Sequence, residues 1–157
     1  MGGLCSSAWG FSGRCAVYTI ASDGSDNRKV PTGVVEDPVL PTWSPDGRVL
    51  AVSGHVGEDW FVYAVSLDGS GIEQLAVDHP SREAGDPAWS PRGSDIAFTV
   101  VGASPTGPSY WGSCEIWTVS AQDLEPRMVT EGCGVAGPGG MNGVGLDWSP
   151  EGTKLAY

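Results

Sequence analysis

The chain has 157 residues, enough for one domain with a substantial core. Its formal net charge of −11 argues against a general affinity for nucleic acid or anionic membranes and favours cationic partners. The 24 glycines, 12 prolines and 7 tryptophans favour short strands joined by turns over long helices. No apolar run approaches the roughly 20 residues that span a bilayer, so membrane insertion is not expected.

The first segment, residues 1–30, has the appearance of an incomplete repeat unit. Leu4–Ser7 is consistent with a strand, and Ala16–Ile20 alternates apolar side chains before the turn Ser22-Asp23-Gly24-Ser25. A short strand is expected at Arg28–Val30. The tryptophan-containing turn that opens the repeat is missing from this segment and is present in the next one.

The second unit, residues 39–77, shows the whole pattern. Trp43-Ser44-Pro45-Asp46-Gly47 predicts a tight turn, because proline fixes φ, serine and aspartate bond the local backbone and glycine accepts a positive φ. An apolar strand, Val49–Val52, follows the turn. Phe61–Val65 then ends in Leu67-Asp68-Gly69-Ser70 and leads into Ile72–Val77. One unit is therefore four antiparallel strands.

A third unit, residues 86–130, and the start of a fourth, residues 144–157, repeat this order. Their turns begin at Trp89 and Trp148. Strands are expected at Ile96–Val101, Glu115–Val119, Pro126–Thr130 and Leu155–Tyr157. Four strands in a repeat of about 40 to 50 residues are typical of a β-propeller blade.

We therefore predict an all-β fold, a β-propeller fragment of about three four-stranded antiparallel blades from a six- to eight-bladed propeller. An immunoglobulin-like sandwich is the alternative, although it would not repeat one turn motif in register. Two explanations of the open arc stay possible. Either the chain is a fragment of a longer gene product, or two copies complete a six-bladed ring, and the unpaired edges invite self-association in both cases.

The W-S-P-D-G turn before an apolar strand, with an aromatic-centred strand that ends in D-G-S, resembles the repeat of TolB-like propellers. The resemblance covers nearly the whole chain, and the third unit departs from it at Ala121-Gln122-Asp123. It implies a noncatalytic scaffold that binds a protein or peptide, as in TolB-like envelope components. Two alternatives stay open, because one fold carries many functions. They are the propeller domain of a larger enzyme such as a prolyl-oligopeptidase-type serine peptidase, and a lyase or hydrolase that acts on sugars in its own channel.

Hairpin geometry pairs the four cysteines as Cys5 with Cys15 and Cys114 with Cys133. Free thiols in the core are the alternative. No C-x-x-C occurs, so we expect no metal and no cofactor. Disulfides imply a periplasmic or extracellular location, although the chain shows no secretory signal.

The predicted topology places the short D-G turns at one end of the blades and the long, variable loops at the other. Loops held on a rigid scaffold commonly carry binding residues. The candidate binding surface contains Trp9, Phe11, His55, Glu58, Asp59, His79, Arg82, Glu83, Tyr110 and Trp111. Tyr110 and Trp111 are the strongest candidates, because aromatic side chains are enriched in binding hot spots. For each residue the alternative is an ordinary loop position.

The remaining tryptophans are expected in structural positions. Trp43, Trp89 and Trp148 are predicted to pack between blades, and Trp60 occupies the strand-start position of Cys15 and Cys114.

No catalytic motif is present in the sequence. There is no G-x-S-x-G elbow and no H-E-x-x-H, and the glycine-rich run 137–145 lacks the lysine of a phosphate-binding loop. We therefore predict no catalytic residues and no enzymatic activity for this chain.

Overall fold

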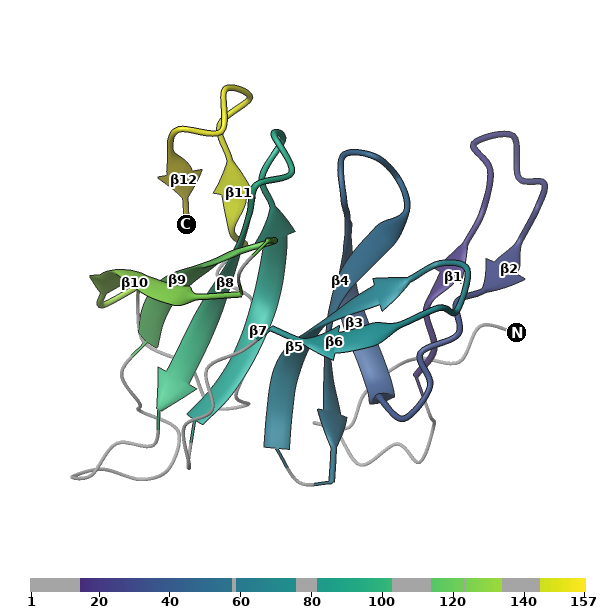
Figure 1. Ribbon diagram of the computed structural model, residues 1–157, viewed down its shortest axis with the longest axis horizontal. Helices are drawn as coiled ribbons and strands as arrows, with labels where there is room; N and C mark the ends of the chain where they lie inside the picture. Colours follow the sequence, from purple (N-terminus) through teal and green to yellow (C-terminus); the bar gives the residue numbers. More distant parts are fainter. Residues whose placement is uncertain (1–14, 58, 76–81, 103–113, 123, 134–144) are drawn as a thin grey trace.

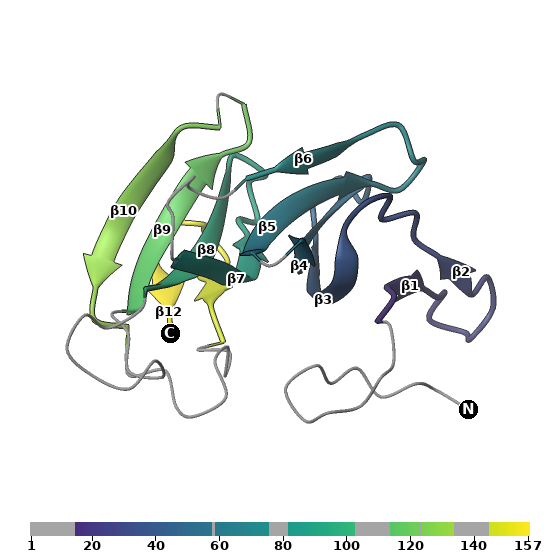
Figure 2. The same ribbon diagram turned by 90° about the horizontal axis from the view of Figure 1, so that it is seen from below.

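The computed structural model describes residues 15–57, 59–75, 82–102, 114–122, 124–133 and 145–157. These residues form strands and turns, arranged in separate antiparallel sheets that follow one another across the molecule (Figures 1 and 2). None of them belongs to a helix long and apolar enough to cross a membrane. The predicted all-β fold is confirmed. The strand expected at Leu4–Ser7 lies outside the described residues.

The first complete sheet contains β3 (Glu36–Trp43), β4 (Val49–Val56), β5 (Asp59–Ser66) and β6 (Ile72–Gln74). The strands pair in chain order, β3-β4-β5-β6, and every pair is antiparallel. This is the meander that the repeat pattern predicts for one blade.

The second complete sheet contains β7 (Arg82–Trp89), β8 (Asp95–Gly102), β9 (Cys114–Ser120) and β10 (Pro126–Glu131). It has the same chain-order antiparallel pairing. The two complete sheets are thus two copies of one structural unit.

Two half-sheets flank these units. β1 (Tyr18–Thr19) pairs with β2 (Arg28–Lys29), and β11 (Asp147–Trp148) pairs with β12 (Leu155–Ala156). By their place in the repeat, β1 and β2 are third and fourth strands, whereas β11 and β12 are first and second strands. The half-sheets lie at opposite ends of the row of sheets (Figure 1).

Apolar clusters fill the space between neighbouring sheets. Leu50 and Val52 pack toward the β1–β2 half-sheet with Val17 and Val30. Their neighbour in β4, Ala51, instead joins the cluster between the two complete sheets, which also contains Val62, Ile96, Phe98 and Val119. Ile116 belongs to a third cluster. Leu146, just before β11, and Leu155 of β12 pack against this cluster. Central strands are therefore buried on both faces, which explains their continuous apolar runs.

The repeated W-S-P turn is a self-contained hydrogen-bonded unit. Ser44 Oγ donates to Asp46 Oδ1 at 2.6 Å and accepts from the Val49 amide at 3.0 Å, while the Gly47 amide donates to the Ser44 carbonyl at 2.9 Å. Gly47 has φ 69°, as the turn requires. Ser90 and Ser149 accept the equivalent amide bonds at 3.1 and 3.2 Å. The motif recurs because one local geometry satisfies its polar groups each time.

Each first strand contains or closely follows an irregularity that the sequence analysis did not predict. Leu40, Asp86 and Gly145 all have positive φ, of 52°, 50° and 64°, and all stand three places before a repeat tryptophan. The pairing register of β3 and of β7 shifts at this point, which identifies a β-bulge. Beyond the bulge the strands continue, so residues 36–38 and 82–85, which lie outside the predicted units, belong to β3 and β7.

The turn geometry predicts an acid-sensitive contribution to stability. Hydrogen bonds from the Ser44 hydroxyl and the Arg48 amide lower the pKa of Asp46 from its ordinary value of 3.8. Its stabilising contribution is therefore present above pH 3.8 and is lost as the pH falls below that value. We expect the melting temperature, measured by circular dichroism, to fall between about pH 5 and pH 3 less steeply in Asp46→Asn than in wild type.

The matched control is Glu151→Gln, at the same place in the third turn. No hydrogen bond to the Glu151 carboxylate occurs among the described residues, so this variant should follow wild type. An Asp46→Asn profile that runs parallel to wild type would contradict the assignment.

Candidate binding face at the loop end of the blades

The two ends of the sheets carry different connections. The turns that follow β1, β3, β7 and β11 all lie at the upper side of Figure 1, and the connection from β4 to β5 lies at the opposite side. We call this opposite end the loop face. Among the described residues it is formed by Glu36, Asp37, His55–Gly57, Trp60 and Glu131, which stand at strand ends remote from the W-S-P turns.

The predicted site residues that the structure describes lie on strands. His55 belongs to β4, Asp59 to β5, and Arg82 and Glu83 to β7. The loop assignment was wrong for all four. The β4–β5 pairing extends to Val56 and Asp59. Backbone pairing of β7 with Val101 and Gly102 likewise continues beyond the bulge. The side chains of Asp59, Arg82 and Glu83 lie outside the described part of the chain. So do the residues Trp9, Phe11, Glu58, His79, Tyr110 and Trp111, whose roles stay predictions.

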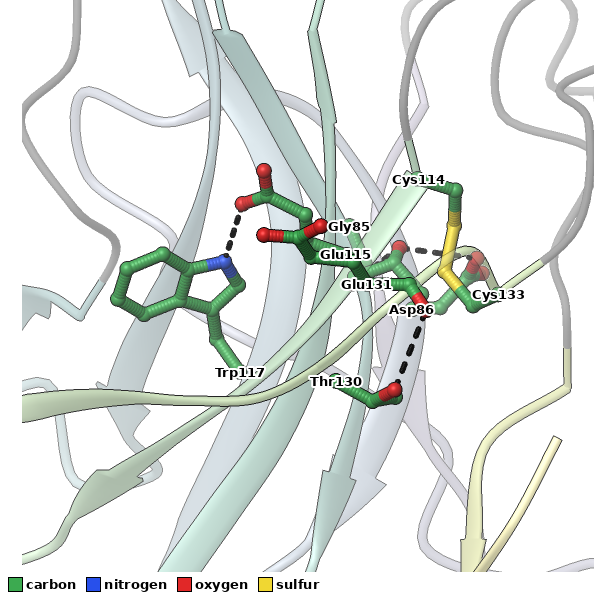
Figure 3. The surroundings of a disulfide bond; sticks show 9 residues. Gly85, Asp86, Cys114, Glu115, Trp117, Thr130, Glu131 and Cys133 are labelled. Carbon is green, nitrogen blue, oxygen red and sulfur yellow. Dashed lines mark hydrogen bonds between the residues drawn. A yellow bond between two sulfur atoms is a disulfide. The ribbon is translucent and has the colours of Figure 1, made fainter.

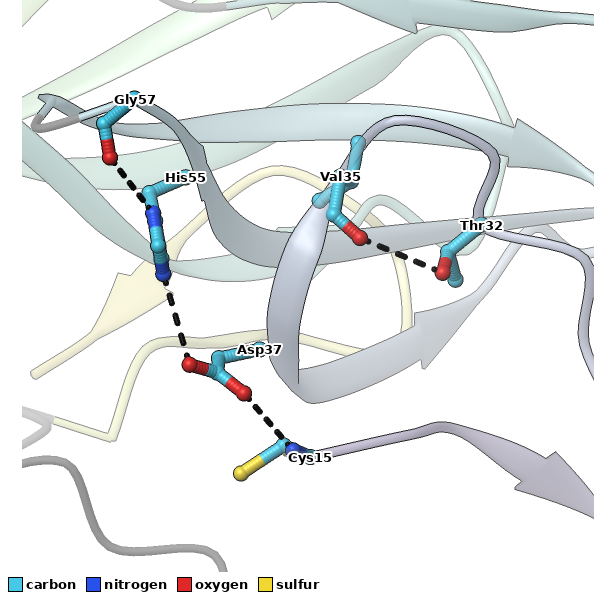
Figure 4. Close-up of polar contacts among 6 residues, drawn as sticks. All are labelled: Cys15, Thr32, Val35, Asp37, His55 and Gly57. Atoms are coloured by element: carbon cyan, nitrogen blue, oxygen red, sulfur yellow. Dashed lines mark hydrogen bonds and ion pairs between the residues drawn. The ribbon is translucent and has the colours of Figure 1, made fainter. Parts of the chain in front are cut away.

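The structure brings His55 together with two residues that the sequence analysis did not place beside it (Figure 4). His55 Nδ1 lies 2.8 Å from the Gly57 carbonyl, and Nε2 lies 3.4 Å from Asp37 Oδ2. Asp37 Oδ1 accepts the Cys15 amide hydrogen at 2.7 Å. Both ring nitrogens therefore face acceptor oxygens, which fixes the orientation of the imidazole.

An aromatic ring completes this group. The Trp60 ring lies 5.1 Å from the His55 ring, centroid to centroid, with the planes tilted by 44°. The side chains of His55 and Asp37 are 19% and 22% exposed, and Trp60 is also partly exposed. We name Asp37, His55 and Trp60 the His55 cluster. It presents an acid, an imidazole and an indole from three neighbouring strands to solvent.

Two further acids near the loop face are buried and serve the fold. Asp86 is 9% exposed, and its Oδ2 lies 3.4 Å from the Thr99 hydroxyl, which donates to the Gly85 carbonyl at 3.1 Å. Glu115 is 7% exposed and accepts a hydrogen bond from Trp117 Nε1 at 2.8 Å (Figure 3). These contacts stabilise the second complete sheet and leave little of either carboxylate for a ligand.

The predicted Cys114–Cys133 disulfide is confirmed (Figure 3). It joins the start of β9 to the chain just beyond β10, with the two Cα atoms 5.2 Å apart. The amides of Gly132 and Cys133 also donate to the Cys114 carbonyl, at 2.8 and 3.2 Å. Cys5 lies outside the described residues, so its pairing with Cys15 stays a prediction.

Charge is distributed unequally between the two ends. Among the described side chains, lysine and arginine occur toward the turn end, where acids such as Asp23, Asp46, Asp68 and Glu151 also lie, and none occurs on the loop face. The six are Arg28, Lys29, Arg48, Arg92, Arg127 and Lys154. The loop face carries the exposed Glu36 and Glu131 and the partly exposed Asp37. Within the described part of the chain, no three His, Cys, Asp or Glu side chains gather as a metal site requires. The arrangement suits recognition of a positively charged group.

No protein-family model matches the chain, and no curated protein matches it. Several solved structures, however, have a fold similar to that of this chain. A putative TolB from Agrobacterium tumefaciens matches 90% of this chain with a TM-score of 0.68 at 21% identity, and TolB from Acinetobacter baumannii matches 89% with 0.64 at 18%. An oligogalacturonate lyase in complex with manganese matches 87% with 0.54 at 12%.

At these identities the similarity concerns the fold. The sheets and the matches together define an all-β propeller, of which this chain forms a part. Among propellers, its fold is similar to that of the TolB structures, which confirms the resemblance predicted from the repeat. The chain spans 49% of the Agrobacterium protein and 31% of the Acinetobacter protein.

The disulfide predicts a measurable loss of stability when it is removed. Closing a loop of this length, with a sequence separation of 19, restricts the unfolded chain. We expect the double variant Cys114→Ser, Cys133→Ser to lose about 3 kcal/mol in the free energy of unfolding, measured by urea denaturation without reductant. Adding reductant should move the wild-type curve toward that of the double variant. Equal stability of oxidised wild type and the double variant would contradict this expectation.

Proposed function

We propose that this chain is a noncatalytic part of a propeller scaffold whose loop face binds a protein or peptide. The observation that carries the proposal is the His55 cluster. Its three side chains come from adjacent strands of a sheet that is packed on both faces, so they are held in place before any partner arrives. Preorganisation of this kind lowers the entropic cost of binding.

The chemistry of the loop face favours a positively charged segment as the partner. Asp37 offers a carboxylate, and the exposed Glu36 and Glu131 add negative charge. The partly exposed Trp60 ring offers a face to a lysine or arginine side chain. The net charge of −11 would also speed the approach of a basic partner and disfavours nucleic acid.

A location in the periplasm or outside the cell is consistent with the disulfide, because such bonds persist in oxidising compartments. The similarity of the fold to the TolB structures also supports this proposal. The alternatives of a larger peptidase and of a sugar lyase gain no support from the described residues. Manganese binding and lyase activity are properties of the matched lyase.

Fluorescence anisotropy with a labelled ten-residue peptide tests the proposal. The peptide alternates lysine and glycine around one phenylalanine, and a second peptide replaces each lysine by glutamate. We expect the lysine peptide alone to bind. Asp37→Asn should weaken its binding about threefold, which is the size of one exposed charge pair.

Asp68→Asn is the matched control, because it removes the same charge from a D-G turn away from the loop face. This variant should bind the lysine peptide as wild type does, at every salt concentration tested. Equal weakening by both substitutions would show that net charge alone attracts the peptide, and the loop face would then not be the site. Binding of both peptides to the same extent would also overturn the proposal.

A further inference from the structure

A groove of about 410 Å³ lies between the two complete sheets, at their turn end. The apolar cluster that joins these sheets ends beside it, and both sheets have all four strands, so the groove does not depend on either half-sheet (Figure 2). We call it the interblade groove. The lining residues that matter here are Ala64, Ser66, Glu73, Trp89, Ile96 and Leu124.

Small side chains on β5 leave this space open. Val62, Ala64 and Ser66 stand at alternate positions of the strand, so they point to the same face of the sheet. Val62 is fully buried in the cluster, whereas Ala64 and Ser66 carry only a methyl and a hydroxymethyl group and stay partly exposed. Larger side chains, Ile96 and Leu124, form the opposite wall. The groove therefore separates two sheet faces, and this shape suits a flat ring.

One charged group stands at the opening of the interblade groove. Glu73 in β6 lies opposite Ala64 in the antiparallel pairing, so its side chain points to the same face of the sheet. Glu73 is exposed, and it is the one charged residue among the described residues that line the groove. A carboxylate next to apolar walls favours a ligand that joins a cationic group to an apolar body.

The wall of the groove also contains a hydrogen-bond donor without an acceptor. Trp148, at the same place in the next repeat, donates its Nε1 hydrogen to the Ala88 carbonyl at 3.0 Å. Trp89 Nε1 is buried as well, but it has no partner among the described residues. A buried donor that stays unpaired is unfavourable. A ligand oxygen that accepts the Trp89 hydrogen would remove this cost.

We propose that the interblade groove binds a small aromatic amine whose ring also carries an acceptor oxygen. The ring lies between the two sheet faces, the ammonium group faces Glu73, and the oxygen accepts a hydrogen bond from Trp89 Nε1. The volume of about 410 Å³ lies within the range of about 300–1,000 Å³ that is typical of small-molecule sites. The groove and the His55 cluster lie at opposite ends of the blades, so the inference does not rest on the proposed peptide binding.

Tyramine is the probe, because it combines a phenol ring with a primary ammonium group. Two-dimensional proton–nitrogen NMR follows the indole N–H signals of the 7 tryptophans, and Trp89→Phe identifies the signal of Trp89. We expect tyramine to shift this signal in a saturable way, with a dissociation constant on the order of 1 mM for a ligand of this size. Phenethylamine, which lacks the oxygen, should bind about fivefold more weakly, which is the size of one hydrogen bond.

Three variants locate the binding. Glu73→Gln should weaken tyramine binding about threefold, as expected for one exposed charge pair. Glu131→Gln is the matched control and should bind as wild type does, because Glu131 is also exposed on an outer strand but lies at the loop face. Ala64→Leu should abolish the shift without lowering the melting temperature, because the added atoms enter open space.

The proposal is overturned if tyramine leaves the Trp89 signal unchanged, if both glutamate substitutions weaken binding equally, or if Ala64→Leu still binds. A shift caused by the lysine peptide and not by tyramine would also overturn it, since the groove would then accept a peptide side chain. Asp37→Asn, which tests the loop face, should leave tyramine binding unchanged. The two proposals can therefore fail independently.

Discussion

The constraint on which this structure depends is that its central strands are apolar on both faces. Leu50 and Ala51 are adjacent in β4, point to opposite sides and are both buried. A sheet of this kind cannot leave either face in water, because each buried aliphatic side chain contributes about 1.5–3 kcal/mol by leaving solvent. Every blade therefore needs a neighbour on each side, and the row of sheets follows from that need.

The same packing decides where a binding site can form. Apolar side chains fill the spaces between the sheets. The polar groups of the W-S-P turns form hydrogen bonds within the turns. At the opposite strand ends, Asp37 and His55 also bond within the fold, but their side chains stay partly exposed. Asp37, His55 and Trp60 are thus free of a role in the apolar clusters, while the strands that carry them are held by those clusters. A rigid frame with variable ends is the general basis for placing recognition residues on such folds.

The parts of the structure that local rules govern could be predicted from the sequence. The turn at Trp43–Gly47 depends on residues within a few places of one another, and the Cys114–Cys133 bond depends on the register of one hairpin. The partner of His55 could not be predicted, because Asp37 reaches it from another strand and with a positive φ of 45°. The only signal was the Asp37-Pro38 pair, which by itself suggests a turn. Trp43 is 51% exposed, contrary to the prediction that it packs between blades, because its burial depends on contacts between strands far apart in the sequence, which no local rule reveals.

The two outermost strands of the complete blades differ in a way that bears on how the blades come apart. β6 is three residues long and exposed throughout, and β5 is the one described strand with which it pairs. β10 is longer, and the covalent link at Cys133 anchors its far end to β9. In the first complete sheet β6 can therefore separate by itself, whereas in the second β10 separates together with β9 as a hairpin. Local opening of the first complete sheet should therefore involve β6 alone. In the second complete sheet the disulfide makes β9 and β10 open together.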